Sequence, residues 1–295
     1  ISIVDPEIVG NMNLIPGGFT AEYGDRSSGV LEIDTLEPEG INTMVGMSFS
    51  AFQVNSSGVF DDDKGYWLIS GRRGFMDVVM KLAGAEEDGE KETIRFWDGF
   101  GKIGYRLTPN NELIFGFLAA DDSMDLEENE PNEILDLESS YGNSYAWLKH
   151  KCIATEKLLF ETTVYAGRVD DTRTIHSEEF GDISDVKDDR KVDIFGAKQD
   201  WSWDVSNRHY LKMGWEYRRY KADYDYMNAF DFENSIPDDR FLPPQGNREY
   251  QGQYSESQYS AYLSDQIRLL DKLSAEIGAR FDHYSVSDEN VIGPR

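Results

Sequence analysis

The sequence predicts an all-β chain, an antiparallel transmembrane β-barrel, and three observations support this fold class. From Ile41 onward, apolar and polar residues alternate with the two-residue period of a β-strand. The connections between these segments are alternately short turns and long polar stretches, which is typical of barrels that cross a membrane. No run of about 18 apolar residues occurs, so a spanning helix is absent, whereas a barrel carries only a weak hydropathy signal.

Composition narrows the functional classes. The chain has 295 residues, enough for one large domain or two, and its formal net charge is -27, which argues against nucleic acid as a partner. The single cysteine, Cys152, cannot form an internal disulfide and leaves the compartment open. The sequence begins without an initiator Met or a signal-peptide core and ends without a closing strand, so we expect an internal piece of a longer protein.

The elements follow in chain order. Residues 1–35 predict a short αβ segment that ends in an alternating strand after Gly29. A tight turn around Ser50-Ala51 is expected between the first two of eleven further strands, and residues 75–82 either continue the third strand or form a short helix at the rim. The eleven strands are expected at 41–49, 52–60, 66–76, 93–107, 112–121, 143–152, 158–175, 191–204, 208–226, 254–268 and 273–284.

The connections between these strands differ in length. Short turns rich in Asn, Asp, Pro and Gly are expected at 61–65, 108–111, 154–157, 206–208 and 270–272. Long polar stretches are expected at 81–92, 122–142, 176–190, 227–252 and from 285 onward. A soluble β-sandwich has no reason to place every long loop at one end, and a propeller would need four short strands per repeat rather than two long ones.

Polar residues on the expected strands carry charges of both signs and are mixed with glycine. In the last strand, Ile277 and Phe281 share one face, while Arg280 and Asp282 share the other. Such a polar face suits a barrel lumen that is packed around another part of the chain. A sandwich with one solvated face shows the same local pattern, so the alternating connections carry the choice of a barrel.

The stretch from Ile15 to Ile33 resembles the last segment of the plug domain of TonB-dependent outer-membrane receptors. It contains a Gly-Gly turn, a Glu-Tyr-Gly-Asp run and a Ser-Gly-Val step into a strand. The motif residues are Gly17, Gly18, Glu22, Tyr23, Gly24, Asp25, Ser28 and Gly29. Residues 66–75, with the Ser-Gly-Arg-Arg sequence, and residues 261–282, with Asp265-Gln266 and Asp271-Lys272-Leu273, resemble barrel motifs of the same family. Phe281 stands where the family more often has Tyr.

The resemblance implies a division of the chain and a function. Residues 1–35 would be the C-terminal part of the plug domain, and residues 36–295 the N-terminal half of the barrel, about eleven of twenty-two strands. Such receptors lie in the outer membrane, among its lipid and lipopolysaccharide. They take up a scarce large solute (a siderophore, cobalamin or an oligosaccharide) with energy from TonB, which pulls a plug segment missing here. A β-rich extracellular adhesion or glycan-binding module with an acidic, calcium-binding surface is the alternative.

Several side chains are candidates for these roles. Arg72 and Arg73 point to opposite faces of a strand, and one of them could pair with a plug carboxylate such as Glu22 or Asp25. Solvated rim positions are the alternative for both arginines. Six aromatic residues are candidates for the girdles at the membrane interfaces, or alternatively for a sandwich core. These aromatic residues are Trp97, Tyr105, Trp201, Trp203, Trp215 and Tyr217. Tyrosines in 217–226 and around 250–262 could instead line a ligand vestibule.

Catalysis and resident cofactors have no support in the sequence. No nucleophile elbow, phosphate-binding loop or dinucleotide-binding motif occurs, and the four histidines lack metal-ligand spacing. The densest acidic run, between Asp121 and Glu138, could hold calcium, but it has no EF-hand spacing and a solvated, mobile loop is the favoured interpretation. We therefore expect no enzyme activity, no cofactor and no bound metal apart from calcium in the outer loops.

Overall fold

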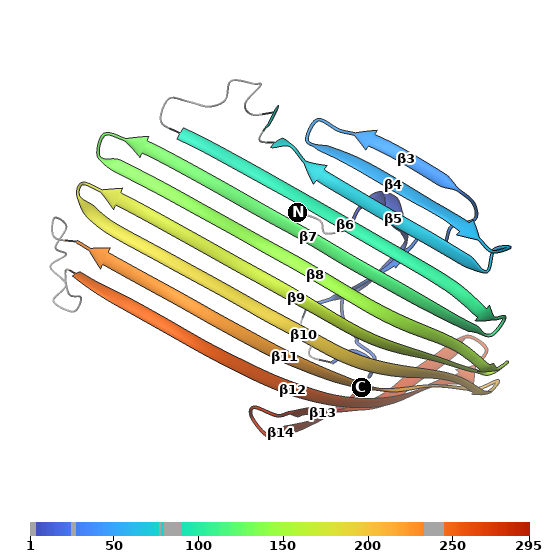
Figure 1. Cartoon of the computed structure of the whole chain (residues 1–295). Coiled ribbons are helices and arrows are strands. Elements are labelled where there is room, and N and C mark those ends of the chain that lie inside the picture. The colour runs from blue at the N-terminus through green and yellow to red at the C-terminus, as the bar shows by residue number, and fades with distance from the viewer. Residues whose placement is uncertain (1–3, 25–27, 77, 80–89, 233–244) are drawn as a thin grey trace.

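The computed structural model describes residues 4–24, 28–76, 78–79, 90–232 and 245–295, and most of them lie in one large antiparallel sheet (Figure 1). The sheet has twelve strands in the order β14 to β3, so each strand pairs with its neighbours in the sequence. The strands are β3 (Asn42–Met47), β4 (Ala51–Phe60), β5 (Gly65–Gly74), β6 (Glu90–Thr108), β7 (Asn111–Glu130), β8 (Glu133–Thr155), β9 (Leu158–Glu179), β10 (Asp182–Ser206), β11 (His209–Asp231), β12 (Gln245–Leu270), β13 (Leu273–Tyr284) and β14 (Glu289–Pro294).

A smaller unit precedes this sheet. The short 3-10 helix η1 (Pro6–Ile8) begins at Asp5, whose side chain accepts a hydrogen bond from the backbone N–H of Glu7. The strands β1 (Val9–Ile15) and β2 (Val30–Thr35) then pair antiparallel in a two-stranded sheet. We call residues 4–36 the N-terminal segment. The predicted domain boundary after residue 35 remains a prediction, although β2 ends at Thr35.

The predicted all-β class is confirmed, and all eleven predicted strands are present. The sheet holds one strand more, because residues that were expected to begin a final loop form the β13–β14 hairpin. The tight turn near residue 50 is also confirmed, since the Ser48 N–H donates to the Ala51 carbonyl at 2.8 Å. After β5 the chain turns into a helix rather than continuing the strand: the N–H groups of Val78 and Val79 both donate to the Phe75 carbonyl at 3.1 Å.

The prediction of long loops is wrong for 122–142 and 176–190. Both stretches are β-hairpins, since β7 continues to Glu130 and β8 starts at Glu133, while β9 and β10 are separated only by Phe180 and Gly181. Phe180 and Gly181 both have positive φ, 50° and 87°, as two-residue hairpin turns require. In the predicted loop 227–252, the residues that the structure describes belong to the ends of β11 and β12. Most of the predicted loop 81–92 lies outside the described residues. The five short turns lie where they were predicted.

The two faces of the sheet differ in what they contact. The inner wall, defined here as the face toward the N-terminal segment, packs Leu68 and Phe100 against Ile8 in a small apolar cluster. The outer wall, the opposite face, exposes large apolar side chains at alternating positions. They include Ile69, Ile103, Phe115, Leu148, Val164, Phe195, Leu263 and Ile277. A water-soluble sheet would bury such a face, so this wall is suited to lipid. In the described part of the chain, no helix is long and apolar enough to cross a membrane.

Candidate functional site: the contact between the N-terminal segment and the inner wall

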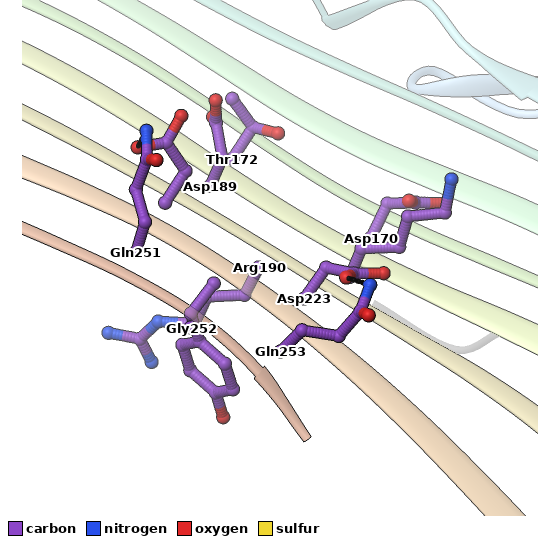
Figure 2. Close-up of a pocket in the computed structure, with 11 residues that line it drawn as sticks. Asp170, Thr172, Asp189, Arg190, Asp223, Gln251, Gly252 and Gln253 are labelled. Carbon is purple, nitrogen blue, oxygen red and sulfur yellow. Dashed lines mark hydrogen bonds between the residues drawn. The ribbon is translucent and has the colours of Figure 1, made fainter. Parts of the chain in front are cut away.

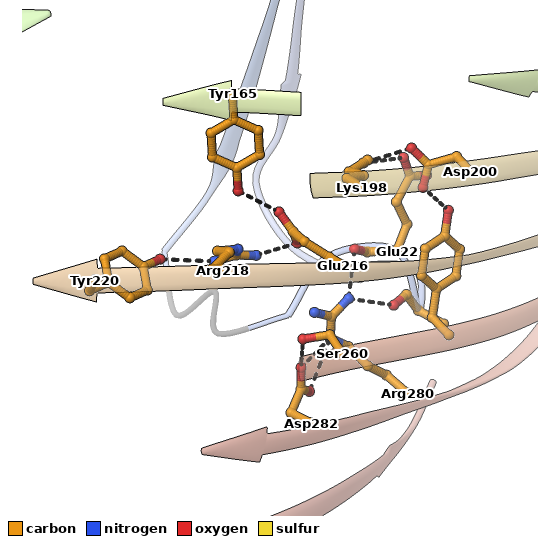
Figure 3. A network of polar contacts seen from close by, with 12 residues as sticks. Glu22, Tyr165, Lys198, Asp200, Glu216, Arg218, Tyr220, Ser260, Arg280 and Asp282 are labelled. Atoms are coloured by element: carbon orange, nitrogen blue, oxygen red, sulfur yellow. Dashed lines mark hydrogen bonds and ion pairs between the residues drawn. The ribbon is translucent and has the colours of Figure 1, made fainter. Parts of the chain in front are cut away.

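A buried guanidinium joins the N-terminal segment to the sheet. Arg280 on β13 has a side chain only 2% exposed, and its Nη1 donates to the backbone carbonyls of Glu22 at 3.0 Å and Ala21 at 3.4 Å (Figure 3). Its Nε donates to both oxygens of Asp282 at 2.9 and 3.0 Å, and Asp282 also accepts from the Ser260 hydroxyl at 2.6 Å. Because the carboxylate fixes the guanidinium, the remaining nitrogens are aimed at the segment.

The side chain of Glu22 forms a second contact with the inner wall. One carboxylate oxygen faces Lys198 Nζ at 3.7 Å (Figure 3), and the other faces Lys212 Nζ at 3.3 Å. Lys198 also contacts Asp200 at 3.1 Å, and Asp200 accepts a hydrogen bond from the Tyr262 hydroxyl at 2.6 Å. The segment is therefore held by charges from β10, β11 and β13, which lie far from it in the sequence.

The physical reason for having glycine differs from one position of the predicted plug motif to the next. Gly24 is buried, and a Cβ atom there would lie 2.3 Å from Nε of Arg280, so only glycine lets the guanidinium approach the backbone. Gly18 has a φ of +66°, which favours glycine even though the surrounding space is open. At Gly17 a Cβ atom would meet no other atom within 4 Å and φ is ordinary, so geometry does not require glycine there.

Tyr23 ties the motif to β2. Its hydroxyl donates to Glu32, which also accepts from Asn13 Nδ2 at 3.1 Å. These hydrogen bonds, with that from Tyr23 the larger, lower the pKa of Glu32. Burial and the hydrogen bond to Glu32 raise the pKa of Tyr23. Of the remaining motif residues, Ser28 is exposed, Gly29 leads into β2, and Asp25 lies outside the described residues.

The predicted arginine pair lies elsewhere in the network. Arg72 has a largely buried side chain and binds Asp98 on β6, with Nε 2.8 Å from Oδ2, and the predicted pairing with Glu22 is replaced by Lys198 and Lys212. Arg73 is exposed, so the two arginines do point to opposite faces. Ser70, two residues before Arg72 on β5, donates to Asp5, so this pair lies near the start of the N-terminal segment and away from the Glu22 contact.

Asp5 provides an anchor that the sequence did not reveal. Its side chain is 1% exposed, and Oδ2 accepts hydrogen bonds from Asn55 Nδ2 at 3.1 Å and from the Ser70 hydroxyl at 3.2 Å. The same carboxylate caps η1, so the N-terminal segment is fixed to β4 and β5 near its start, while Glu22 in its middle is held by β10, β11 and β13. The only signal in the sequence was the Asp-Pro-Glu run, which suits a helix start.

Further along the strands, the inner wall is rich in tyrosine and arginine. Arg218 Nη2 binds Glu216 at 2.6 Å, and the Tyr165 hydroxyl donates to the same carboxylate at 2.9 Å (Figure 3). Farther from the short turns, the alternation of side chains along each strand places further tyrosines on the inner wall. The rings of Tyr224 and Tyr254 meet edge to face, with centroids 6.2 Å apart. The inward tyrosines are Tyr141, Tyr145, Tyr220, Tyr224, Tyr226, Tyr250 and Tyr254. Whether these tyrosines line a ligand vestibule, one of the two uses predicted for them, remains a prediction.

The outer wall holds the predicted interface aromatics. Trp97, Trp203 and Trp215 are exposed there, Tyr105 stacks on Phe60, and their membrane role remains a prediction. Trp201 and Trp203 lie near the short turn of β10, whereas Tyr217 pairs with Tyr259 further along, with ring centroids 5.1 Å apart.

Beyond these aromatic rings the outer wall becomes polar. A hollow of about 540 Å³ is lined mainly by carboxylates and amides (Figure 2). Gln253 Nε2 donates to Asp223 at 2.5 Å and Gln251 Nε2 donates to Asp225 at 3.2 Å, so two of the four carboxylates accept hydrogen bonds from amides. The hollow offers no nucleophile paired with a base.

The acidic residues and histidines do not gather around a metal position. The densest acidic run lies in the β7–β8 hairpin and not in a loop. The described ranges contain no group of three or more His, Cys, Asp or Glu side chains placed to hold a metal ion. His176 and His209 instead contact single aspartates, with Nδ1 of His176 2.6 Å from Asp185 and Nδ1 of His209 2.8 Å from Asp265.

Comparison with known proteins decides the family. A model of the family described as "TonB dependent receptor-like, beta-barrel" matches residues 88–295. The chain belongs to this family. Its members are transporters and receptors of the outer membrane, so this chain is an outer-membrane protein and the adhesion alternative is set aside. A search of curated proteins finds no match.

Solved structures share the fold. The siderophore receptor PiuA of Acinetobacter baumannii matches with a TM-score of 0.62 and 11% identity over 98% of this chain and 50% of its own. A variant of the ferric enterobactin receptor PfeA of Pseudomonas aeruginosa matches with a TM-score of 0.65 and 14% identity. The match covers 99% of this chain and 46% of that receptor. The transporter YddB of Escherichia coli matches with a TM-score of 0.67 and 10% identity. The match covers 99% of this chain and 45% of that transporter. The chain therefore spans about half the length of these proteins.

Proposed function

We propose that this chain is part of a receptor that takes up a siderophore-type solute across the outer membrane with energy from TonB. The observation that carries the proposal is the fastening of the N-terminal segment to the inner wall of a barrel of this family. A segment held at Asp5, Glu22 and the Arg280 guanidinium occupies the lumen, as a receptor that must block free diffusion requires.

The chemistry of the inner wall supports the solute class. Ferric complexes of catecholate or carboxylate chelators are anionic and carry flat or aromatic groups. Toward the β7–β8 and β9–β10 hairpin turns, the inner wall offers tyrosine rings together with two arginines. Arg248 lies 5.6 Å from the Phe230 ring centroid, and Arg190 forms an ion pair with Asp188. Similar solved structures include receptors named for ferric enterobactin and ferric preacinetobactin. TonB would act on a segment outside these residues, and no catalytic step is proposed.

Uptake by the full-length receptor in its own cells tests the proposal. Deletion of the gene should abolish accumulation of radiolabelled iron from one or more ferric siderophores, and dissipation of the proton gradient should have the same effect. The variants R190Q and R248Q should weaken solute binding, while K157Q, in a short turn at the opposite end, should not. If iron uptake survives the deletion while cobalamin or oligosaccharide uptake is lost, the solute is not a siderophore and belongs to the class whose uptake is lost.

A further inference from the structure

A cavity lies between the N-terminal segment and the middle strands of the inner wall. Its volume is about 670 Å³, and residues of β1, β2 and β5–β8 line it. Tyr66 and Glu112 line this cavity and are the second residues of β5 and β7, so it lies at the end of the sheet that carries the short turns. We call it the wall cavity. The inward tyrosines lie toward the opposite end of the strands, so a solute that enters there must pass the N-terminal segment to reach it.

The N-terminal segment is fastened on both sides of the wall cavity. Asp5 is bound by β4 and β5, while Glu22 and the backbone beside it are bound by β10, β11 and β13. Between these anchors, Lys102 on β6 donates to the Leu36 carbonyl at 3.2 Å and to the Thr35 hydroxyl. The cavity then separates the segment from β7 and β8. A solute that moves along β7 and β8 therefore leaves both anchors in place.

The wall side of the cavity offers aromatic rings and a cation without a counter-ion. The rings of Phe100 and Trp147 have centroids 6.1 Å apart, and both residues line the cavity. Lys149 also lines it, is half-buried and forms no ion pair within the described ranges. Its neighbour Lys151 is already bound, with Nζ 3.5 Å from Oε1 of Glu161. Lys149 is therefore the cation that can meet a ligand, beside an aromatic surface that suits flat groups.

The two sides of the wall cavity differ in charge. Asp34 on β2 and Glu37 just beyond it line the segment side, and neither forms an ion pair in the part of the chain that the structure describes. The wall side has a net positive charge, from three lysines and two glutamates. These residues are Lys102, Lys149, Lys151, Glu112 and Glu161. An anionic solute is repelled by the segment and attracted to the wall, so it is directed along β8.

We propose that the wall cavity is an inner binding site for an anionic, aromatic solute on its way past the N-terminal segment. Lys149 holds an anionic oxygen of the solute, and Trp147 and Phe100 hold a flat ring. The volume lies within the roughly 300–1,000 Å³ of pockets that bind small molecules. The inference rests on the proposed uptake function and adds a route to it, along β6–β8 and between the anchors at Asp5 and Glu22.

Uptake by the full-length receptor with single substitutions on β8 tests the inference. K149W fills the wall cavity and should lower the uptake rate at least about tenfold, while the affinity for solute at the cell surface stays within about twofold of wild type. L148W is the matched control, because Leu148 is 49% exposed on the outer wall, where a tryptophan meets lipid, and its uptake should equal that of wild type. K149A removes the charge but leaves the space open, so it should lower uptake less than K149W does.

Each outcome decides a separate point. Uptake by K149W at the wild-type rate overturns the inference, as does an equal loss in K149A and K149W. A loss in K149W that comes with faster hydrogen exchange of residues 19–24 also overturns it, because Lys149 would then act through the fastening of the segment. If K149W shows no heat-dependent gel shift of a folded barrel, I33W fills the same cavity from the segment side and takes its place. Lack of energy-dependent uptake by the wild-type receptor would instead refute the proposed function.

Discussion

At the scale of single residues, the N-terminal segment depends on one buried arginine. Arg280 donates to two backbone carbonyls of the segment and to Asp282, and its side chain is 2% exposed. Replacement by Gln leaves Asp282 buried without its cation, and loss of one partner of a buried pair typically costs about 3 kcal/mol or more. We expect R280Q to accelerate hydrogen exchange of residues 19–24 in the full-length receptor, whereas R268Q, at an exposed position on β12, leaves exchange unchanged. Wild-type protection in R280Q would show that Glu22 holds the segment alone.

Three of the four motif glycines give a graded series. G24A places a Cβ atom 2.3 Å from Arg280 Nε, so the guanidinium must move and we expect a loss of about 1–3 kcal/mol. G18A forces alanine to a φ of +66° and should cost about 1 kcal/mol through backbone strain alone. G17A should change stability by less than about 0.5 kcal/mol, because no atom lies nearby. Exchange protection of residues 15–24 measures all three, and an equal effect at Gly17 and Gly24 would contradict the crowding argument.

The Tyr23–Glu32 hydrogen bond predicts a pH dependence. The pKa of Glu32 is lower in the folded segment than in an unfolded chain, so its contribution is present above the ordinary carboxyl pKa and is lost as pH falls through the lowered value. We expect E32Q to lower the melting temperature of the N-terminal segment at about pH 7, and this difference from wild type should shrink as pH falls below the ordinary carboxyl pKa. Calorimetry of the full-length receptor checks this, and a difference that persists at acid pH would assign the effect to packing.

Sequence alone located the motif but not its partners. The glycines and the Glu-Tyr-Gly-Asp run were recognisable because local turns limit the residue types. Arg280, Lys198 and Lys212 were not identified as partners of Glu22, since nothing in their own strands distinguishes a lysine that meets the segment from one that meets water. That pairing depends on how β10, β11 and β13 stack side by side, which a single sequence does not record.

At the scale of elements, the alternation of apolar and polar residues predicted strands only where one face of the strand meets lipid. Beyond that level, both faces of a strand meet water, and residues such as Asp125 and Glu138, which pair in β7 and β8, look like a polar loop. The strands were therefore predicted too short, and β14, which has only six residues, was missed. The short turns were predicted well, because their Asn, Asp, Pro and Gly residues reflect backbone requirements that do not depend on solvent.

The turn between β9 and β10 offers a test of this element. Phe180 has a φ of 50° and is 68% exposed, so it carries the strain of the left-handed region without a packing gain. Asn tolerates this conformation and favours such turns when it precedes a glycine. We expect F180N to stabilise the hairpin by about 1 kcal/mol. Slower hydrogen exchange of residues 175–186 would show the gain, F180V should show the reverse, and faster exchange in F180N would mean that the ring is needed.

At the scale of the whole molecule, the sheet of the described residues has two edges. β3 and β14 each pair with a single strand in the described part of the chain, and both leave backbone donors and acceptors without a ladder partner. A sheet that faces lipid cannot leave these groups open, because no water is available to them in the bilayer core. Closure must therefore come from further strands, which agrees with a chain that spans about half the length of similar receptors.

The two open edges should decide how residues 1–295 behave when they are expressed alone. Refolded in detergent, they should form oligomers or aggregates through the edges at β3 and β14, and should show no heat-dependent shift of a monomer band on a gel. The full-length parent, treated identically, should give the shift because its edges are joined. A monodisperse monomer of residues 1–295 with a cooperative melt would mean that the twelve strands can satisfy their own edges, and the inner wall would then enclose a far narrower lumen than the N-terminal segment occupies now.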